Sequence, residues 1–146
     1  MIYHLVYVSS AVGPITKAGF SDILSTSRFN NKLKDITGIL LYYEGNIMQV
    51  LEGEEESVMK LYNKIKLDSR HHITRMVSTK SAQRSFPDWP MSFKMLTAFE
   101  WVAYAGSLES NTSRLLFKLK NTSLETDTMV NSLMPAANFT PSWIRA

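Results

Sequence analysis

The sequence predicts an α+β fold of the ferredoxin-like type, an antiparallel sheet with two helices on one face. The first reason is the order of its segments, because strand-like and helix-like stretches alternate as β-α-β-β-α-β, with roughly 30 residues in each half. The second is a tight hairpin between two stretches of helical periodicity. The 146 residues, 45% hydrophobic and 20% charged, have the composition of one globular domain with its own core.

The composition excludes several kinds of chemistry. The sequence contains no cysteine, so disulfides, thiolate catalysis and cysteine-bound metals are ruled out. It has no apolar run of membrane-spanning length, and its first residues have neither the basic character nor the cleavage site of a signal peptide. We therefore expect a cytoplasmic protein without a signal peptide or a membrane partner. The net charge is +3, and the 16 lysines and arginines are scattered, which indicates a solvated surface rather than a nucleic-acid site.

The first strand and helix follow from residue type and periodicity. Ile2–Ser9 is rich in strand formers, and both faces of the expected strand are mostly apolar, which predicts a central place in the sheet. Thr16 to about Asn30 has the periodicity of a helix that Thr16 caps. We expect the pair Asn30-Asn31 to end this helix.

The middle of the chain supplies the hairpin, the second helix and the remaining strands. Residues 38–53 form two apolar strands that turn at Glu44-Gly45-Asn46. Residues 54–67 form a helix whose acidic first turn suits the helix dipole, which we prefer to a metal site. Ile73–Ser78 is the next strand, and Phe93–Leu96 is a candidate for a fifth. Right-handed crossovers then place the first and third strands side by side in the middle of the sheet.

The C-terminal part has a different character. Residues 110–119 and 124–134 are short helical candidates, and a tail of residues 135–146 follows them. We expect residues 98–146 to form a helical extension of the unit built by residues 1–97, because a segment this short rarely folds alone. The sheet face opposite the two helices is apolar, and we expect these C-terminal helices or another subunit to cover it.

One polar side chain stands in the middle of an apolar strand. Gln49 lies between Met48 and Val50, and a buried amide without partners is costly. Alternation and topology place Gln49 beside Tyr7 on the neighbouring strand, with Asn31 at the end of the first helix near the same space. Two interpretations remain open: the polar groups line a small-molecule pocket, or Tyr7 and Gln49 satisfy each other in the core.

Six segments, in their order and spacing, resemble the BLUF family of blue-light sensors that bind a flavin. They are Tyr7-Val8-Ser9, Arg28-Phe29-Asn30-Asn31, Ile36–Tyr42, Gln49–Gly53, Arg70-His71-His72 and Trp89-Pro90-Met91. The resemblance covers roughly residues 1–97. The rest of the chain resembles the helical cap of short BLUF proteins that lack an effector domain.

The resemblance implies four photoactive residues. Tyr7 matches the tyrosine that donates an electron and a proton to the excited flavin. Gln49 matches the glutamine whose amide rearranges or tautomerises between that tyrosine and the flavin. Trp89 and Met91 match a pair on the last strand that exchanges in and out of the pocket, and the sequence leaves open which of them faces the chromophore.

The resemblance also implies a flavin-binding set. Asn31 would bond the N3 and O4 edge with Asn30 as a support, Arg70 would reach the pyrimidine side, and two isoleucines would sandwich the ring system. Lys64 would touch a flavin phosphate or be solvated. The whole set is Tyr7, Ile23, Ser27, Asn30, Asn31, Gln49, Lys64, Ile65, Arg70 and His71.

These observations predict a photoreceptor that binds FAD or another flavin without a covalent bond. It would not be an enzyme, and it would signal through its C-terminal region to a separate protein, as a homo-oligomer. Two alternatives remain, a light-independent flavin redox enzyme and a cofactor-free interaction module of ferredoxin-like fold. The neighbours His71-His72 suggest a metal, but a third ligand is not evident, so we expect none.

Overall fold

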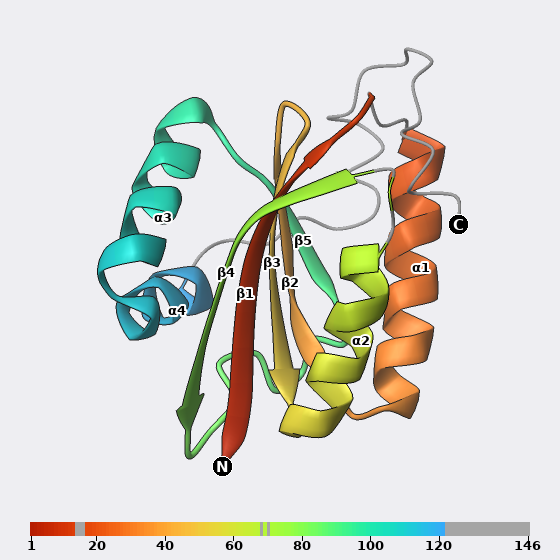
Figure 1. Cartoon of the computed structure of the whole chain (residues 1–146), viewed down its shortest axis with the longest axis vertical. Coiled ribbons are helices and arrows are strands. Elements are labelled where there is room, and N and C mark those ends of the chain that lie inside the picture. Colours follow the sequence, from red (N-terminus) through yellow and green to blue (C-terminus); the bar gives the residue numbers. More distant parts are fainter. Residues whose placement is uncertain (14–16, 68, 70, 122–146) are drawn as a thin grey trace.

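The computed structural model describes residues 1–13, 17–67, 69 and 71–121. One sheet runs through it in the strand order β4-β1-β3-β2-β5 (Figure 1). Its strands are β1 (Ile2–Ala11), β2 (Thr37–Tyr43), β3 (Asn46–Gly53), β4 (His71–Ser81) and β5 (Ser92–Met95). The prediction that the first and third strands are neighbours in the middle of the sheet is confirmed.

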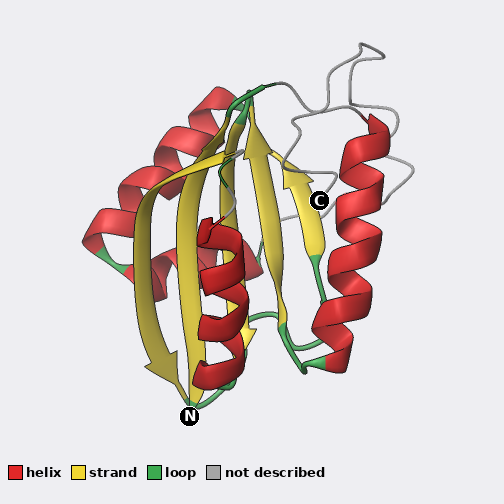
Figure 2. Ribbon diagram, turned by 45° about the vertical axis from the view of Figure 1, so that its right-hand side comes forward, coloured by secondary structure: helices red, strands yellow, loops and turns green. Residues whose placement is uncertain are grey.

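Helices cover both faces of the sheet. Figure 2 shows α1 (Lys17–Leu33) and α2 (Glu55–Leu67) on one face, as the β-α-β-β-α-β order predicts. On the other face lie α3 (Ala98–Ser110) and α4 (Thr112–Lys120). No helix among the described residues has the length and apolar character needed to cross a membrane.

The first helix runs past its predicted end. It continues through Asn30-Asn31 to Leu33, and Asp35 then takes a positive φ of 56°. Asn31 stays helical because its side chain is buried and its Nδ2 donates to the Pro90 carbonyl oxygen at 2.9 Å. This tertiary contact outweighs the weak helix propensity of asparagine. The predicted cap at Thr16 lies outside the described residues.

The sheet is mixed, which corrects the antiparallel sheet that we expected. β5 pairs with β2 in parallel, with Leu40 opposite Phe93. The reason is the path of residues 82–91, which leave β4 at one edge and cross to the far edge on the α3–α4 side of the sheet (Figure 1). The chain enters β5 from the end where β2 begins, so the two strands run the same way.

A helix that the sequence analysis missed follows β5. α3 begins after Thr97, whose Oγ1 accepts from the Glu100 backbone N–H at 3.2 Å, while Glu100 Oε1 accepts from the Thr97 N–H at 3.1 Å. The spacing Thr97-x-x-Glu100 is the signal that could have predicted this start. The helix expected at residues 110–119 is α4, and the one expected at residues 124–134 lies outside the described residues.

The β2–β3 hairpin turns where the sequence predicts. Glu44 and Gly45 have φ values of 43° and 84°, as a two-residue hairpin turn of this hand requires. Gly38, at the start of β2, has a different reason to be glycine. A Cβ atom there would lie 1.9 Å from the carbonyl oxygen of Val50, so only glycine lets the two strands approach this closely.

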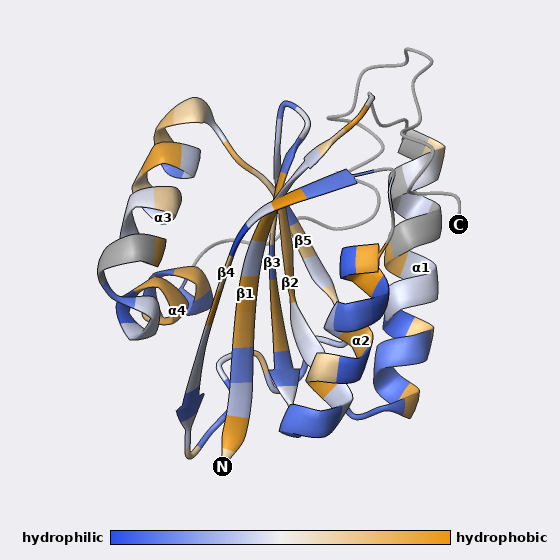
Figure 3. Cartoon of the chain, viewed as in Figure 1, coloured by the Kyte–Doolittle hydropathy of each residue, from blue (hydrophilic) through white to orange (hydrophobic). Residues whose placement is uncertain are grey.

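The sheet separates two apolar clusters, and Figure 3 shows the apolar stretches of β1 and β3 between them. The cluster on the α1–α2 side, here the first core, contains Tyr3, Leu5, Tyr7, Leu24, Ile36, Leu40, Tyr42, Ile47, Leu51, Val58, Tyr62, Met91 and Phe93. The cluster on the α3–α4 side, here the second core, contains Val6, Ile39, Leu41, Met48, Val50, Phe86, Leu96, Leu108, Leu115, Leu116 and Leu119. The expected cover of the second face by C-terminal helices is therefore confirmed.

Candidate functional site

Tyr7 and Gln49 meet in the middle of the sheet. They are direct partners in the antiparallel pairing of β1 with β3, and both side chains are buried on the α1–α2 face. Tyr7 Oη donates a hydrogen bond to Gln49 Oε1. The predicted pairing of a phenol and an amide under the two helices is confirmed.

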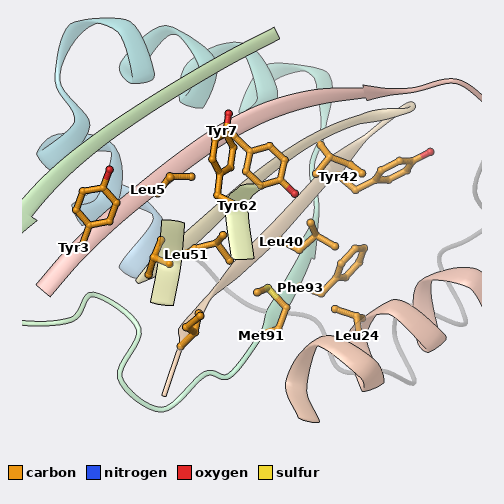
Figure 4. Packing of buried hydrophobic residues seen from close by; sticks show 13 residues of the cluster. Tyr3, Leu5, Tyr7, Leu24, Leu40, Tyr42, Leu51, Tyr62, Met91 and Phe93 are labelled. Atoms are coloured by element: carbon orange, nitrogen blue, oxygen red, sulfur yellow. The ribbon is translucent and has the colours of Figure 1, made fainter. Parts of the chain in front are cut away.

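The surroundings of Tyr7 keep its phenol neutral. Burial raises the pKa of Tyr7 well above its ordinary value, and the neighbouring Tyr62 raises it further. The two rings lie 5.9 Å apart between centroids, tilted by 49° (Figure 4). A neutral phenol keeps its proton to donate, which the bond to Gln49 requires.

The other end of the Gln49 amide has a weaker partner. Its Nε2 donates to the Met91 sulfur at 3.4 Å, and a thioether is a poor hydrogen-bond acceptor. The amide is therefore held firmly at its oxygen by Tyr7 and loosely at its nitrogen. An amide presents a donor at one end and an acceptor at the other, so turning it over would exchange what it offers to Tyr7 and to the space beside Met91.

Met91, and not Trp89, is the residue beside the amide. Met91 is buried in the first core, in contact with Gln49. Trp89 packs against the second core, where its ring stacks on Phe86 with centroids 5.4 Å apart and planes at 24°. The structure thus places Met91 on the face of the Tyr7–Gln49 pair and Trp89 on the opposite face.

The end of α1 fixes the segment that carries Met91. Asn31 Nδ2 donates to the Pro90 carbonyl oxygen at 2.9 Å, and Arg28 Nε donates to the Met91 carbonyl oxygen at 2.8 Å. From β2, the Gly38 N–H donates to the Trp89 carbonyl oxygen at 2.8 Å. These bonds bring Asn31 close to the Gln49–Met91 pair, as the sequence analysis expected.

The other predicted residues of α1 lie farther out. Ser27 is half-buried, and Asn30 is exposed, so its side chain faces solvent rather than the Tyr7–Gln49 pair. The side chain of Ile23 lies outside the described residues.

Of the predicted residues in α2 and the segment after it, some are buried or half-buried and others are exposed. Ile65 is half-buried against the first core, and Lys64 is exposed. His71 is buried at the start of β4, which begins two residues before the strand that we expected from Ile73, and its Nε2 lies 2.7 Å from the Ile65 carbonyl oxygen. Arg70 lies outside the described residues.

Two further residues belong to this site and were missed as site residues. Tyr62 contacts Tyr7 by its ring, and its place in the buried stripe of α2 was the available signal. Ser9 shares the strand face of Tyr7, and its buried Oγ has no hydrogen-bond partner among the residues that the structure describes. Strand alternation from Tyr7 to Ser9 could have predicted its direction.

The residues present fit a flavin. The ring edge of a flavin carries an N–H donor flanked by carbonyl acceptors, which side-chain amides such as those of Asn31 and Gln49 match. The Ser9 hydroxyl adds a buried polar group without a hydrogen-bond partner among the described residues. Apolar side chains from α1, α2 and β5 surround these groups, as is usual for small-molecule sites.

Comparisons with known proteins identify the family of this chain. Residues 2–92 match the BLUF family, described as sensors of blue light using FAD. The beta subunit of photoactivated adenylate cyclase from Euglena longa is 36% identical over 92 residues, which are 60% of this chain and 10% of that protein. The corresponding subunit from Euglena gracilis is 33% identical over 90 residues, with the same shares. This chain therefore spans about a tenth of the length of these relatives.

Solved structures show the same fold. The photo-activated state of BlsA superposes with a TM-score of 0.70 at 25% identity, covering 86% of this chain and 99% of that one. The dark state of BlrB, a BLUF protein, gives 0.60 at 28% identity and covers 90% and 97%. A bacterial light-regulated adenylyl cyclase gives 0.62 at 33% identity and covers 81% of this chain and 36% of that chain. With its Tyr7–Gln49 pair and a family match over most of its length, this chain belongs to the BLUF family of blue-light sensors that use FAD.

Proposed function

We propose that this chain is a blue-light photoreceptor that binds FAD without a covalent bond, and that its response starts at Gln49. The observation that carries this proposal is the unequal bonding of one buried amide. Tyr7 Oη holds its oxygen, whereas the Met91 thioether, 3.4 Å away, is the partner of its nitrogen. A phenol oxygen can accept as well as donate, so turning the amide over exchanges its bond to Tyr7 and gives up only the weak bond to Met91, as a switch requires.

Bound FAD would supply the absorption of blue light and an excited state that accepts an electron. The residues of the chain provide what such chemistry needs. Tyr7 is a buried neutral phenol, and its proton already lies on a hydrogen bond to Gln49 Oε1. A phenol that loses an electron becomes a strong acid, so this bond gives the proton an acceptor in place. Turning the amide then records the event without a covalent bond.

The predicted flavin-binding set is part of the proposal. Asn31 and Gln49 are buried polar groups on the α1–α2 side of the sheet, and Ser27, Ile65 and His71 are buried or half-buried there. The exposure of Asn30 and Lys64 suits contacts at the outer, phosphate-bearing end of a dinucleotide better than contacts with its ring. We assign Ile23 and Arg70 to the site from the sequence alone.

The output of the chain is also proposed. The photoactive residues do not act on a substrate, so we infer that the chain is a sensor and not itself an enzyme. We further infer that it forms a homo-oligomer and contacts a separate effector protein. We propose residues 1–97 as the sensor and residues 98–146 as its cap. The packing of Leu115, Leu116 and Leu119 of α4 into the second core supports a cap that belongs to the same unit.

Reconstitution with FAD tests the proposal. The purified chain should retain FAD through gel filtration and appear yellow. Blue light should shift its flavin absorption to longer wavelength, and the shift should reverse in the dark. A chain that retains no FAD, or a flavin spectrum that light leaves unchanged, would contradict the proposal.

A further inference from the structure

A polar cluster with a buried carboxylate at its centre lies on the opposite face of the sheet from the Tyr7–Gln49 pair. It consists of His4, Thr37, Glu52, Ser81 and Arg84, here the Glu52 cluster. Glu52 is 0% exposed and His4 is 1% exposed. A buried carboxylate is costly unless several donors satisfy it, so its partners indicate what it stabilises.

The Glu52 carboxylate holds the start of the segment that leads to Met91. Its Oε2 accepts from the Ser85 N–H at 3.0 Å, and its Oε1 accepts from the Phe86 N–H at 2.5 Å. The Thr37 hydroxyl donates to Oε1 at 3.2 Å, and His4 Nδ1 lies 2.9 Å from Oε2. Each oxygen therefore binds one backbone N–H and one side chain.

His4 connects the Glu52 carboxylate to the end of β4. Its Nδ1 faces Glu52 Oε2, and its Nε2 lies 2.6 Å from Ser81 Oγ. Ser81 Oγ in turn donates to the Gln83 carbonyl oxygen at 2.8 Å. The cluster therefore joins β1, β3 and the end of β4.

Arg84 ties the same segment to the sheet a second time. Its Nη1 donates to Thr37 Oγ1 at 2.9 Å and to the Glu52 carbonyl oxygen at 3.1 Å. Its Nη2 donates to the Asp35 carbonyl oxygen at 2.8 Å. Residues 84–86 are thus fixed to the ends of β2 and β3 before the chain turns toward β5.

The chain between residues 84–86 and the residue that contacts the Gln49 amide is short. Phe86 is buried, its carbonyl oxygen accepts from the Trp89 N–H at 3.3 Å, and its ring stacks on that of Trp89. Trp89 lies on the second core and Met91 lies on the other side of the sheet against Gln49, only two residues further along the chain, so the position of Trp89 limits where Met91 can lie.

We propose that Glu52, paired with His4, is a positioning residue that seats Trp89 on the second core and thereby helps to place Met91 against the Gln49 amide. This assignment extends the proposed function, because it adds Glu52 to the groups that fix the resting partner of the switch. Glu52 acts through the backbone of Ser85 and Phe86 and does not itself touch Gln49.

The variant Glu52→Gln isolates this role. A carboxamide keeps the volume but has one acceptor oxygen, so it can accept from Ser85 or Phe86 but cannot satisfy both as the carboxylate does. Glu55→Gln is the matched control, because Glu55 is 53% exposed and pairs with Lys80 on the surface. Both variants remove one negative charge.

Nuclear magnetic resonance of the full chain in the dark provides the test. In Glu52→Gln, amide hydrogen exchange at Ser85 and Phe86 should become roughly tenfold faster, the effect of losing one charge-assisted bond. The cross-peak between the Met91 methyl and the Gln49 side-chain amide should weaken, while exchange at Leu5 and Leu51 stays slow. Glu55→Gln should change none of these. Wild-type exchange or a wild-type Met91–Gln49 cross-peak in folded Glu52→Gln would overturn the proposal.

A second variant decides the question if Glu52→Gln does not fold. Thr37→Val removes one donor to Glu52 and one acceptor for Arg84, and it should produce the same changes at about threefold. Wild-type values in Thr37→Val would then overturn the proposal. The measurement is made on the chain before and after addition of FAD. Failure to bind FAD would refute the proposed function, whereas the exchange rates of the chain alone would still decide the role of Glu52.

Discussion

Gln49 is a buried amide with partners of unequal strength. Its oxygen accepts from a phenol, and its nitrogen faces a thioether. The sequence predicts the first partner, because strand alternation and a central pairing of β1 with β3 bring Tyr7 to the same face. It could not predict the second, because Met91 reaches Gln49 only through the fold of residues 82–91, where no periodic pattern applies.

Replacing Tyr7 tests its role directly. Tyr7→Phe should still bind FAD, because the ring remains, but should lose the light-induced shift, because phenylalanine has no hydroxyl proton to donate. Tyr3→Phe is the matched control: Tyr3 is also buried on this face of β1, and its hydroxyl donates to Met59 sulfur at 3.6 Å. Absorption spectra in the dark and after blue light measure both. A normal shift in Tyr7→Phe, or its loss in Tyr3→Phe, would refute this role.

The raised pKa of Tyr7 predicts a dependence of stability on alkaline pH. The folded state keeps this phenol neutral, and the unfolded state ionises it near pH 10. The stabilisation from Tyr7 is therefore complete below pH 10 and is lost progressively as the pH rises above it. Urea unfolding at pH 9 and pH 11 should show a larger loss of unfolding free energy in wild type than in Tyr7→Phe. Equal losses would contradict the assigned environment.

At the scale of elements, periodicity predicted the strands and helices whose conformation depends on their own sequence. The alternation of β1 and the apolar stripe of α2 led to the observed strand and helix. β5 was predicted close to its observed residues, but its direction was predicted wrongly. The direction depends on a connection that crosses the whole sheet. α3 was missed because the capping pair Thr97 and Glu100 was not used as a start signal.

The close approach of β2 and β3 makes Gly38 sensitive to substitution. Gly38→Ala should lower the free energy of unfolding by about 3 kcal/mol or prevent folding, because a Cβ there would overlap the Val50 carbonyl oxygen. Gly106→Ala, in α3, is the control: a Cβ there meets nothing within 4 Å among the described residues, and alanine should stabilise the helix by up to about 1 kcal/mol. Chemical denaturation measures both. A tolerated Gly38→Ala would disprove the tight β2–β3 contact.

The start of α3 depends on Thr97. Thr97→Ala removes the side-chain oxygen that accepts from the Glu100 N–H and should cost about 1 kcal/mol of stability. Thr97→Ser keeps a hydroxyl in the same place and should stay within a few tenths of wild type. Thermal or urea unfolding followed by circular dichroism gives the comparison. If alanine and serine behave alike, the capping box does not stabilise this helix.

At the scale of the whole molecule, the sheet separates the candidate site from the second core. The α1–α2 side carries the Tyr7–Gln49 pair, and the α3–α4 side carries the second core, on which Trp89 rests. Residues 82–91 join the two sides, because Trp89 belongs to one and Met91 to the other. Residues 82–91 therefore connect Gln49 to the second core through Met91 and Trp89. The sequence predicted that Tyr7, Gln49 and Asn31 lie near one another, but it could not show that the buried Glu52 binds the backbone of this segment.

The most direct test of the central claim is the light-minus-dark absorption spectrum of the FAD-loaded wild type beside that of Gln49→Leu. Leucine keeps the apolar volume of the position but offers neither donor nor acceptor. We predict a reversible shift to longer wavelength in the wild type and none in Gln49→Leu, with FAD bound in both. An equal shift in the two proteins would contradict the claim that the Gln49 amide is the switch.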